Sequence, residues 1–178
     1  MARKEIREIH CFVIKDDRLR IYLASSAEGA IGVGLLLDKG PDSIEYFRKV
    51  FPNAALIEDE NWNRPLMGAI KAALAGRKVP EFKMGVKHTP FQMKVWKGIS
   101  KIPFGKTLTY GEVAAMTGCP RGARAIGQAM GSNPFPLIFP CHRVVAAGGL
   151  GGFAGGLELK KYLLNREKAL IGSSGQAT

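Results

Sequence analysis

The pattern of apolar and polar positions in the first 37 residues predicts three β-strands. Ile6 to Ile14 is rich in strand-forming residues, and Arg18 to Ala24 alternates polar with apolar side chains. Asp16-Asp17 and Glu28-Gly29 have the composition of turns, and Ile31 to Leu37 is a third candidate strand. We therefore predict a small antiparallel sheet.

After this sheet the apolar spacing becomes helical. Pro41-Asp42-Ser43 can open a helix that continues through Phe51 and stops at Pro52. We predict that a second helix starts at Asn63, because Arg64-Pro65 follows and because apolar side chains then share one face before Gly76, at Leu66, Ile70, Ala73 and Leu74. Neither helix carries residues that suggest chemistry.

A break in the pattern separates the two halves of the chain. Arg77 to His88 contains Pro80 and several charges, so we predict a linker at 81–89 between an N-terminal α/β domain, 1–80, and a C-terminal domain, 90–178. Thr89 then caps a helix with Pro90 at its first position. Its apolar residues fall at helical spacing, at Phe91, Val95, Trp96 and Ile99.

Two short helices are predicted next. Thr109 to Thr117 begins with a Thr cap that is followed three residues later by Glu112. Gly118-Cys119-Pro120 breaks the pattern, and Arg121 to Met130 forms the second helix. Helix, tight turn and helix make a helix-turn-helix pattern, although other helical hairpins have the same spacing.

Charge is distributed unevenly along the 178 residues. Residues 1–80 hold 13 Lys/Arg against 11 Asp/Glu, a net +2, whereas residues 81–178 hold 13 against 4, a net +9. A basic domain attracts polyanions such as nucleic acids. On charge alone, a solvated basic surface explains the excess equally well.

Cysteine usage points to a reduced, intracellular setting. The three cysteines (Cys11, Cys119 and Cys141) are too few for a disulfide framework, and no cluster has zinc-ligand spacing. His10 and Cys11 are adjacent but lack plausible partners, so we interpret them as packing residues. No apolar stretch resembles a signal peptide or a membrane span, so we expect a cytoplasmic protein without membrane contact.

Candidate chemistry is concentrated in Asn133 to Val145, NPFPLIFPCHRVV. Its three prolines disfavour a helix, and Leu137 to Phe139 fits a short buried strand or extended segment. The segment delivers Cys141 directly beside His142 and Arg143. A thiol reacts as thiolate, and cationic neighbours lower its pKa. The alternative is a buried structural cysteine.

PCHRV, preceded by NP and followed by a glycine-rich loop, resembles the active-site motif of the O6-alkylguanine-DNA alkyltransferases, the methylated-DNA–protein-cysteine methyltransferases. The resemblance extends from about Pro90 to Glu167. It implies an α+β fold, with a ribonuclease-H-like N-terminal sheet domain and a mostly helical domain containing a helix-turn-helix. It also implies a monomer without metal or cofactor, whose partner is double-stranded DNA containing O6-alkylguanine.

The resemblance implies catalytic roles for five residues. Cys141 is the acceptor, His142 is a general base acting through a bridging water, and Glu167 orients the imidazole. Tyr110 contacts guanine N3, and Asn133 is a hinge before the active-site segment. Without the resemblance, Glu167 is a solvated helix residue, Tyr110 a packed aromatic and Asn133 a turn residue.

DNA contacts are implied in the same way. Arg124 matches an arginine that enters the base stack when the modified nucleotide is flipped out through the minor groove. Small residues around it permit close approach to the backbone, at Gly111, Ala123, Ala125 and Gly127. Backbone groups of Val144 and Ala154, with Phe153 and Gly155, border the guanine. Phe153-Ala154 replaces the common Tyr-Ser of the family, which removes a side-chain hydroxyl contact to O6.

The implied function is direct, irreversible and stoichiometric transfer of the alkyl group from O6-alkylguanine, and from O4-alkylthymine, to Cys141. Two alternatives come from other classes. A DNA-binding regulator with the same fold would have no need of the thiol. A Cys-His hydrolase would need an oxyanion hole and a base elsewhere in the chain, and the sequence shows neither.

Overall fold

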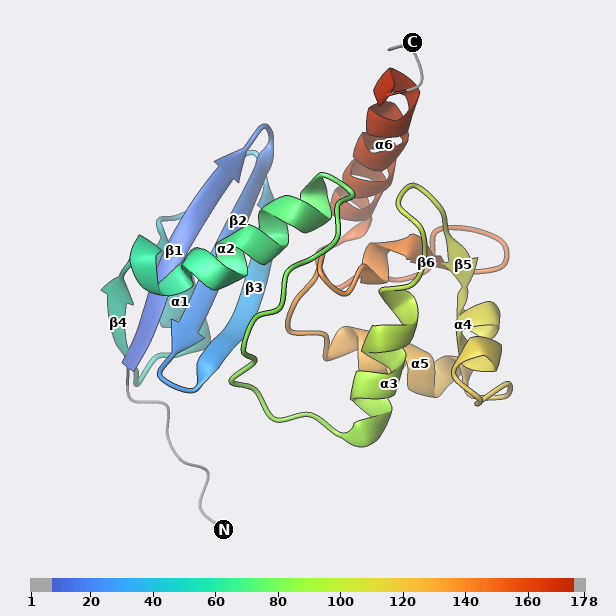
Figure 1. The fold of residues 1–178 in the computed structure, drawn as a ribbon, viewed down its shortest axis with the longest axis horizontal. Helices are drawn as coiled ribbons and strands as arrows, with labels where there is room; N and C mark the ends of the chain where they lie inside the picture. Colours follow the sequence, from blue (N-terminus) through green and yellow to red (C-terminus); the bar gives the residue numbers. More distant parts are fainter. Residues whose placement is uncertain (1–7, 175–178) are drawn as a thin grey trace. The chain divides into compact units, whose positions relative to one another are not determined.

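The structure is a computed structural model that describes residues 8–174 (Figure 1). These residues form two compact units. The first comprises residues 8–72 and 78–87, and the second comprises residues 73–77 and 88–174. Strands and helices occur in both, so the mixed α+β class predicted from the sequence is confirmed.

The first unit is built on a four-stranded sheet in the order β3-β2-β1-β4. Strands β1 (Glu8–Asp16), β2 (Leu19–Ser26) and β3 (Gly29–Leu37) form the predicted antiparallel meander. Asp17, at φ 51°, makes the first turn, and Gly29, at φ 126°, starts β3. Part of the first predicted strand, Ile6 and Arg7, lies outside the described residues.

Helices cover both faces of this sheet. Helix α1 (Ser43–Val50) begins at the Asp42 cap and contributes Phe47 to a core that includes Cys11 and Tyr22. Helix α2 (Glu60–Leu74) crosses a face of the sheet (Figure 1). The Ser25 hydroxyl donates to the Asn63 side chain of α2 at 3.0 Å. Ser25 and Tyr22 have opposite parity on β2, so α1 and α2 lie against opposite faces.

This unit differs from the sequence-based expectation in two places, a misplaced helix start and a missed strand. Helix α2 begins at Glu60 rather than at Asn63, because the Asp59 carboxylate accepts from the Trp62 N–H at 3.0 Å and caps the helix earlier. Asn63 is instead buried inside the helix. A fourth strand, β4 (Ala55–Glu58), pairs parallel to β1 and was not predicted. Its four residues are too few to display a period.

The segment predicted as a linker, 81–89, is partly built into the first unit. The Ala30 N–H donates to the Lys83 carbonyl at 2.8 Å, and the Gly85 N–H donates to the Ala30 carbonyl at 2.7 Å. A Cβ at Gly29 would lie 2.5 Å from that Lys83 oxygen, so this approach requires glycine. Residues 83–85 are therefore fixed beside the start of β3.

The second unit is mostly helical. Its helices are α3 (Pro90–Ile99), α4 (Tyr110–Met116), α5 (Ala123–Gly131) and α6 (Leu157–Ser174). Strands β5 (Leu108–Thr109) and β6 (Val144–Val145) form a short parallel pair, and Cys141–Arg143 is one turn of 3-10 helix.

The predicted helix starts at Thr89 and Thr109 are confirmed. Each threonine hydroxyl accepts from the backbone N–H three residues on, and the side chain there accepts from the threonine's own N–H, which completes a capping box. Trp96 of α3 is buried and donates from its indole nitrogen to the Ala129 carbonyl of α5 at 2.8 Å. This bond and the surrounding apolar contacts fix α3 against α5.

The segment before Cys141 is buried but is not a strand. Leu137 has φ 77°, and the Phe139 N–H donates to the Phe135 carbonyl at 2.9 Å, so the chain turns here. The three prolines do exclude an α-helix. They leave a compact turn rather than the predicted extended segment, and Cys141 follows on 3-10 backbone.

Within residues 8–174, no helix is long and apolar enough to cross a membrane. In the same part of the chain, no group of three or more His, Cys, Asp or Glu side chains could hold a metal ion. All three cysteines are free thiols.

Candidate active site

Cys141 is held by the turn that precedes it. Its N–H donates to the Phe139 carbonyl at 2.7 Å. Asn133 braces the same turn from the end of α5, because its side-chain NH2 donates to the Phe139 carbonyl at 2.7 Å and its side-chain oxygen accepts from the Phe135 N–H at 3.0 Å. The predicted hinge residue therefore connects α5 to the cysteine segment.

His142 and Glu167 are in direct contact, although 25 positions separate them in the sequence. The Nε2 atom of His142 lies 2.7 Å from Glu167 Oε1. Both side chains are buried, at 1% and 8% exposure. The other ring nitrogen, Nδ1, is buried and has no hydrogen-bond partner in the described part of the chain. It is therefore free to accept a proton.

Arg143 holds Glu167 in place. Its guanidinium donates to both Glu167 carboxylate oxygens at 3.0–3.1 Å and to the Ile102 carbonyl at 2.8 Å. The Gly105 N–H adds a bond of 2.8 Å to Glu167 Oε2. The guanidinium also lies over the Phe104 ring, 5.2 Å from its centroid. Glu167 is thus fixed by a cation, an imidazole and a backbone donor.

These contacts decide the charge on each group. Burial would raise the pKa of Glu167, but the hydrogen bonds from His142 and Arg143 outweigh it and lower this pKa to about 2. Glu167 is therefore ionised at neutral pH. Burial lowers the pKa of His142 despite its bond to Glu167, so the imidazole is neutral at rest.

Cys141 differs electrostatically from its sequence-based prediction. Burial raises the pKa of its thiol, opposed mainly by a hydrogen bond from Asn133 and by the charge of Lys160. We predicted that His142 and Arg143 would lower this pKa through positive charge. That was wrong, because His142 is neutral and Arg143 points its charge at Glu167. The resting site holds a thiol, and the arrangement requires a base during reaction.

The glycine-rich loop lies beside Tyr110. The Tyr110 hydroxyl donates to the Gly152 carbonyl at 3.3 Å, and a Cβ at Gly151 would lie 3.0 Å from the Tyr110 ring. Burial raises the pKa of Tyr110, and ionisation of the nearby Cys141 raises it further. Tyr110 is thus in contact with the loop and close enough to Cys141 for the two groups to interact electrostatically.

The other residues predicted to border the base lie on this loop or on strand β6, which leads into it. Val144 is buried on β6, Phe153 is half-buried and Ala154 is exposed. A Cβ at Gly155 would lie 2.6 Å from Leu159 and 3.2 Å from the Phe153 ring, so a larger residue does not fit there without displacement.

Lys160 was missed by the sequence analysis. It is fully buried, and its ammonium donates to the carbonyls of Val144 at 2.6 Å, Leu150 at 2.5 Å and Gly152 at 3.2 Å. The sequence held one indication of it. Lys160 shares a helical stripe with buried Leu163 and Glu167, so an ionisable side chain occupies a core position of α6.

Residues predicted to contact DNA are found on α4 and α5. Arg124 is exposed and has no hydrogen-bond or ion-pair partner among residues 8–174. Gly111 and Ala123 are exposed, whereas Ala125 and Gly127 are half-buried, and a Cβ at Gly127 would lie 3.9 Å from the Tyr110 ring. This surface is therefore made mostly of small residues, and Arg124 adds a long cationic side chain near the start of α5.

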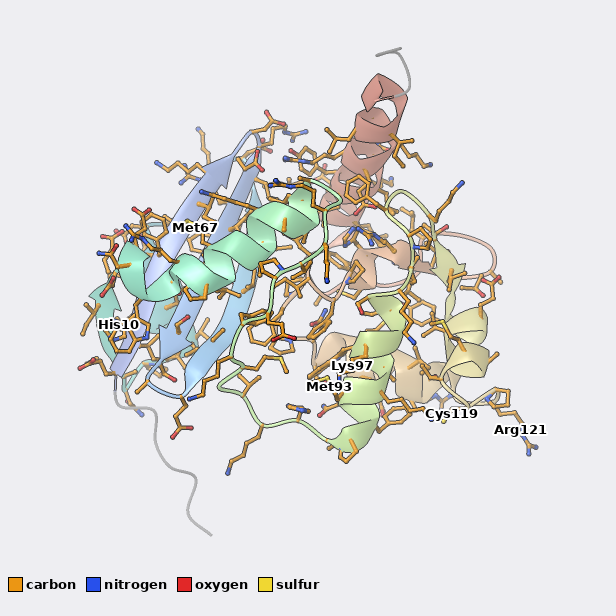
Figure 2. All side chains as sticks on the ribbon, viewed as in Figure 1. His10, Met67, Met93, Lys97, Cys119 and Arg121 are labelled. Carbon is orange, nitrogen blue, oxygen red and sulfur yellow. The ribbon has the colours of Figure 1, made fainter. Side chains whose placement is uncertain are left out.

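The turn between these helices contains the predicted breaker. Gly118 has φ 74°, a conformation that favours glycine, and it reverses the chain. Figure 2 shows Cys119 and Arg121 at this turn, with Arg121 extending away from the protein. Gly122 precedes α5 and offers no side-chain cap, which leaves the first backbone N–H groups of α5 without that partner.

Comparisons with known proteins agree with this geometry. Residues 90–169 match the family described as 6-O-methylguanine DNA methyltransferase, DNA binding domain. The inducible methylated-DNA–protein-cysteine methyltransferase of Bacillus subtilis is 37% identical over 150 residues, which is 83% of each chain. The methylated-DNA–protein-cysteine methyltransferase of Methanosarcina acetivorans is 39% identical over 149 residues, covering 83% of this chain and 90% of that one.

Solved structures give the same result. The O6-methylguanine methyltransferase of Mycobacterium tuberculosis superimposes with a TM-score of 0.68 at 31% identity, covering 90% of this chain and 93% of that one. A structure of the M. tuberculosis protein in complex with DNA also has a TM-score of 0.68, at 30% identity over 92% of this chain and 94% of that one. The fold and the site thus define a cysteine-dependent methyltransferase. The chain belongs to the methylated-DNA–protein-cysteine methyltransferase family.

Proposed function

We propose that this protein repairs DNA by moving the alkyl group of O6-alkylguanine to the sulfur of Cys141. The proposal rests on the buried pair formed by Glu167 and by His142, which follows Cys141 in the sequence, and we call this pair the relay. A neutral His142 has one nitrogen on an ionised Glu167 and the other free. An imidazole held in this way is able to take the thiol proton at the moment of reaction.

The proposed reaction begins with transfer of the thiol proton. His142 Nδ1 receives the thiol proton, through a bridging water, while Nε2–H donates to Glu167. The thiolate attacks the alkyl carbon, so a sulfur–carbon bond forms and the carbon–O6 bond breaks. The electron pair of that bond passes to the guanine, and the departing base gains one proton, which is balanced by the thiol proton that His142 took up and gives back. Tyr110 supports this step by donating to guanine N3 as negative charge develops on the base.

Single use follows from the product. A thioether is a poor leaving group, and the described residues offer no second nucleophile at Cys141, so each molecule acts once. We extend the proposal to O4-alkylthymine, in which the alkyl carbon is attached to the same kind of oxygen. No metal or cofactor is required, since displacement needs only a soft nucleophile and a stabilised leaving group.

DNA binding is assigned to α4 and α5, which we propose to act as a helix-turn-helix. Small residues on α5 permit close approach to the minor groove, and Arg124 is free to enter the base stack when the modified nucleotide flips out. Flipping is required because the alkyl carbon is inaccessible inside a duplex. A side chain in the gap offsets part of an unstacking cost of a few kcal/mol.

The first unit completes the proposal. Its β1-β2-β3 meander, followed by α1 and the parallel strand β4, supports a ribonuclease-H-like fold. The described residues of this unit contain no comparable relay. We propose that residues 1–80 and 90–178 act as separate domains, and that the protein works as a cytoplasmic monomer.

Two measurements test the proposal. Excess duplex DNA containing O6-[³H-methyl]guanine should transfer one methyl group per protein molecule, after which transfer stops. Continued turnover would contradict it. Arg124→Ala should slow transfer from duplex DNA on the order of tenfold or more, but leave transfer from the free base O6-methylguanine unchanged. Equal slowing on both substrates would remove Arg124 from the flipping step.

A further inference from the structure

Lys160 is the one buried lysine among the described residues, and its three contacts share one property. All are backbone carbonyls, of Val144, Leu150 and Gly152. A neutral amine has two N–H donors, whereas an ammonium has three. Burial lowers the pKa of Lys160, but three carbonyl acceptors match the three donors of the charged form.

These carbonyls lie on both sides of a single bend. Val144 precedes it on β6, whereas Leu150 and Gly152 follow it. Between them, residues 146 and 149 form an isolated antiparallel bridge, in which the Gly149 N–H donates to the Ala146 carbonyl at 3.3 Å. Little else in this stretch resists opening, because residues 148–152 include four glycines.

We propose that Lys160 is a positioning residue, which clamps residues 144–152 into the closed form that shapes the base pocket. This inference rests on the proposed function, because the pocket is defined by the reaction. We call residues 144–152, together with the Lys160 Nζ atom that their carbonyls bind, the carbonyl clamp. We expect the clamp to affect binding of the modified base and not the affinity for DNA as a whole.

The clamp also connects the pocket wall to Tyr110. The Gly152 carbonyl accepts from both Lys160 and the Tyr110 hydroxyl. Releasing the ammonium frees Gly152 and shifts the group to which Tyr110 is bonded. Since misplacement by about 1 Å costs on the order of a hundredfold in rate, loss of the clamp affects the chemistry even though Lys160 touches neither substrate nor sulfur.

The charge of Lys160 gives a second, independent readout. It lies close enough to Cys141 to favour the thiolate over the thiol. A role confined to protein folding does not alter the titration of a thiol in a folded variant. A clamp that places positive charge beside the sulfur does alter it, and its removal shifts the pH profile of thiol alkylation to higher pH.

Lys160→Met tests the clamp, with Lys161→Met as the matched control, since Lys161 is the neighbouring lysine and is exposed. Lys160→Met should slow transfer from both methylated duplex DNA and free O6-methylguanine by ten- to a hundredfold. It should also speed hydrogen exchange at the amides of residues 146–152 and move iodoacetamide alkylation of Cys141 to higher pH. Lys161→Met should change none of these, and Lys160→Arg should restore part of the rate.

Unchanged exchange in residues 146–152, together with a wild-type rate on the free base, would overturn the clamp. The wild-type protein provides a test that needs no variant. Reductive methylation with formaldehyde should modify Lys161 readily and Lys160 slowly, and equal rates would contradict the closed clamp. If the wild-type protein transferred no methyl group, the proposed function would fail, while the exchange and lysine-labelling results would still decide whether the clamp exists.

Discussion

Two histidine–cysteine pairs occur in this protein, one in each unit. His10 precedes Cys11 on β1, and His142 follows Cys141 in the second unit. Both histidines are buried, and both place Nε2 on a glutamate, at 3.0 Å from Glu8 and 2.7 Å from Glu167. The two pairs therefore have the same residue types and the same kind of histidine–glutamate contact.

The two pairs differ in their backbone conformation and in the surroundings of each side chain. Cys11 and His10 are consecutive on a strand, so their side chains point to opposite faces of the sheet. Cys11 is fully buried, with its thiol on the Ile57 carbonyl, and His10 stacks on Trp62 with ring centroids 3.9 Å apart. The glutamate differs as well, because the Glu8 side chain is 58% exposed and that of Glu167 is 8% exposed.

The difference is what suits His142, and not His10, to the role of base that we propose. Its carboxylate must be desolvated and must keep its charge, and for Glu167 that charge depends on Arg143 and the Gly105 N–H. A solvated partner such as Glu8 gives a weak surface interaction. The thiol must also lie outside a sheet, and Cys141 does so on one turn of 3-10 helix.

The largest expected effect comes from exchanging the two thiols for alanine. Cys141→Ala should abolish methyl transfer from methylated duplex DNA, because the acceptor sulfur is gone. Its affinity for that duplex in a filter-binding assay should remain within about threefold of wild type, since phosphate contacts dominate affinity. Cys11→Ala should transfer one methyl group per molecule, and loss of transfer there would show that the two pairs are not distinct.

A smaller effect is expected from the two glutamates. Glu167→Gln should slow transfer on the order of 10- to 100-fold and raise the pH at which iodoacetamide alkylates Cys141, because His142 loses the anion that stabilises its protonated form. Glu8→Gln should leave both quantities within twofold of wild type. An identical pH profile for Glu167→Gln and wild type would remove Glu167 from the relay.

The smallest effect is on acid stability. The pKa of Glu167 is lowered to about 2 in the folded protein from an ordinary value of 4.5, so its contribution to the free energy of unfolding is complete above about pH 4.5 and is lost as pH falls towards 2. Urea unfolding at several pH values should show wild type losing more stability over this window than Glu167→Gln. Parallel curves for the two proteins would contradict an ionised, paired Glu167.

Much of the fold was predictable because its signals are local. Local signals depend on neighbouring residues alone, and they include the strand-forming composition of β1, the alternation in β2, the Thr89 and Thr109 caps and the Gly118 turn. β4 was missed because four residues show no period, and the start of α2 was misplaced because Asp59 and Asn63 are both good caps.

Site residues could be predicted from the sequence only where they belong to a recognisable motif. The sequence places His142 beside Cys141, but whether a cation faces the sulfur depends on where Arg143 turns, and it turns to Glu167. Lys160 acts through contacts with residues 8–16 positions earlier in the chain. Such contacts depend on the loop conformation, which local sequence does not specify.

If the pair of His142 and Glu167 activates Cys141 as we propose, Cys141 is the acceptor among the three cysteines of the chain. Wild-type protein should be incubated with excess duplex DNA containing O6-methylguanine, digested and analysed by peptide mass spectrometry. We expect a mass increase of one methyl group on the peptide that contains Cys141, with Cys11 and Cys119 unmodified. A methyl group on either of the other cysteines, or on none of the three, would contradict it.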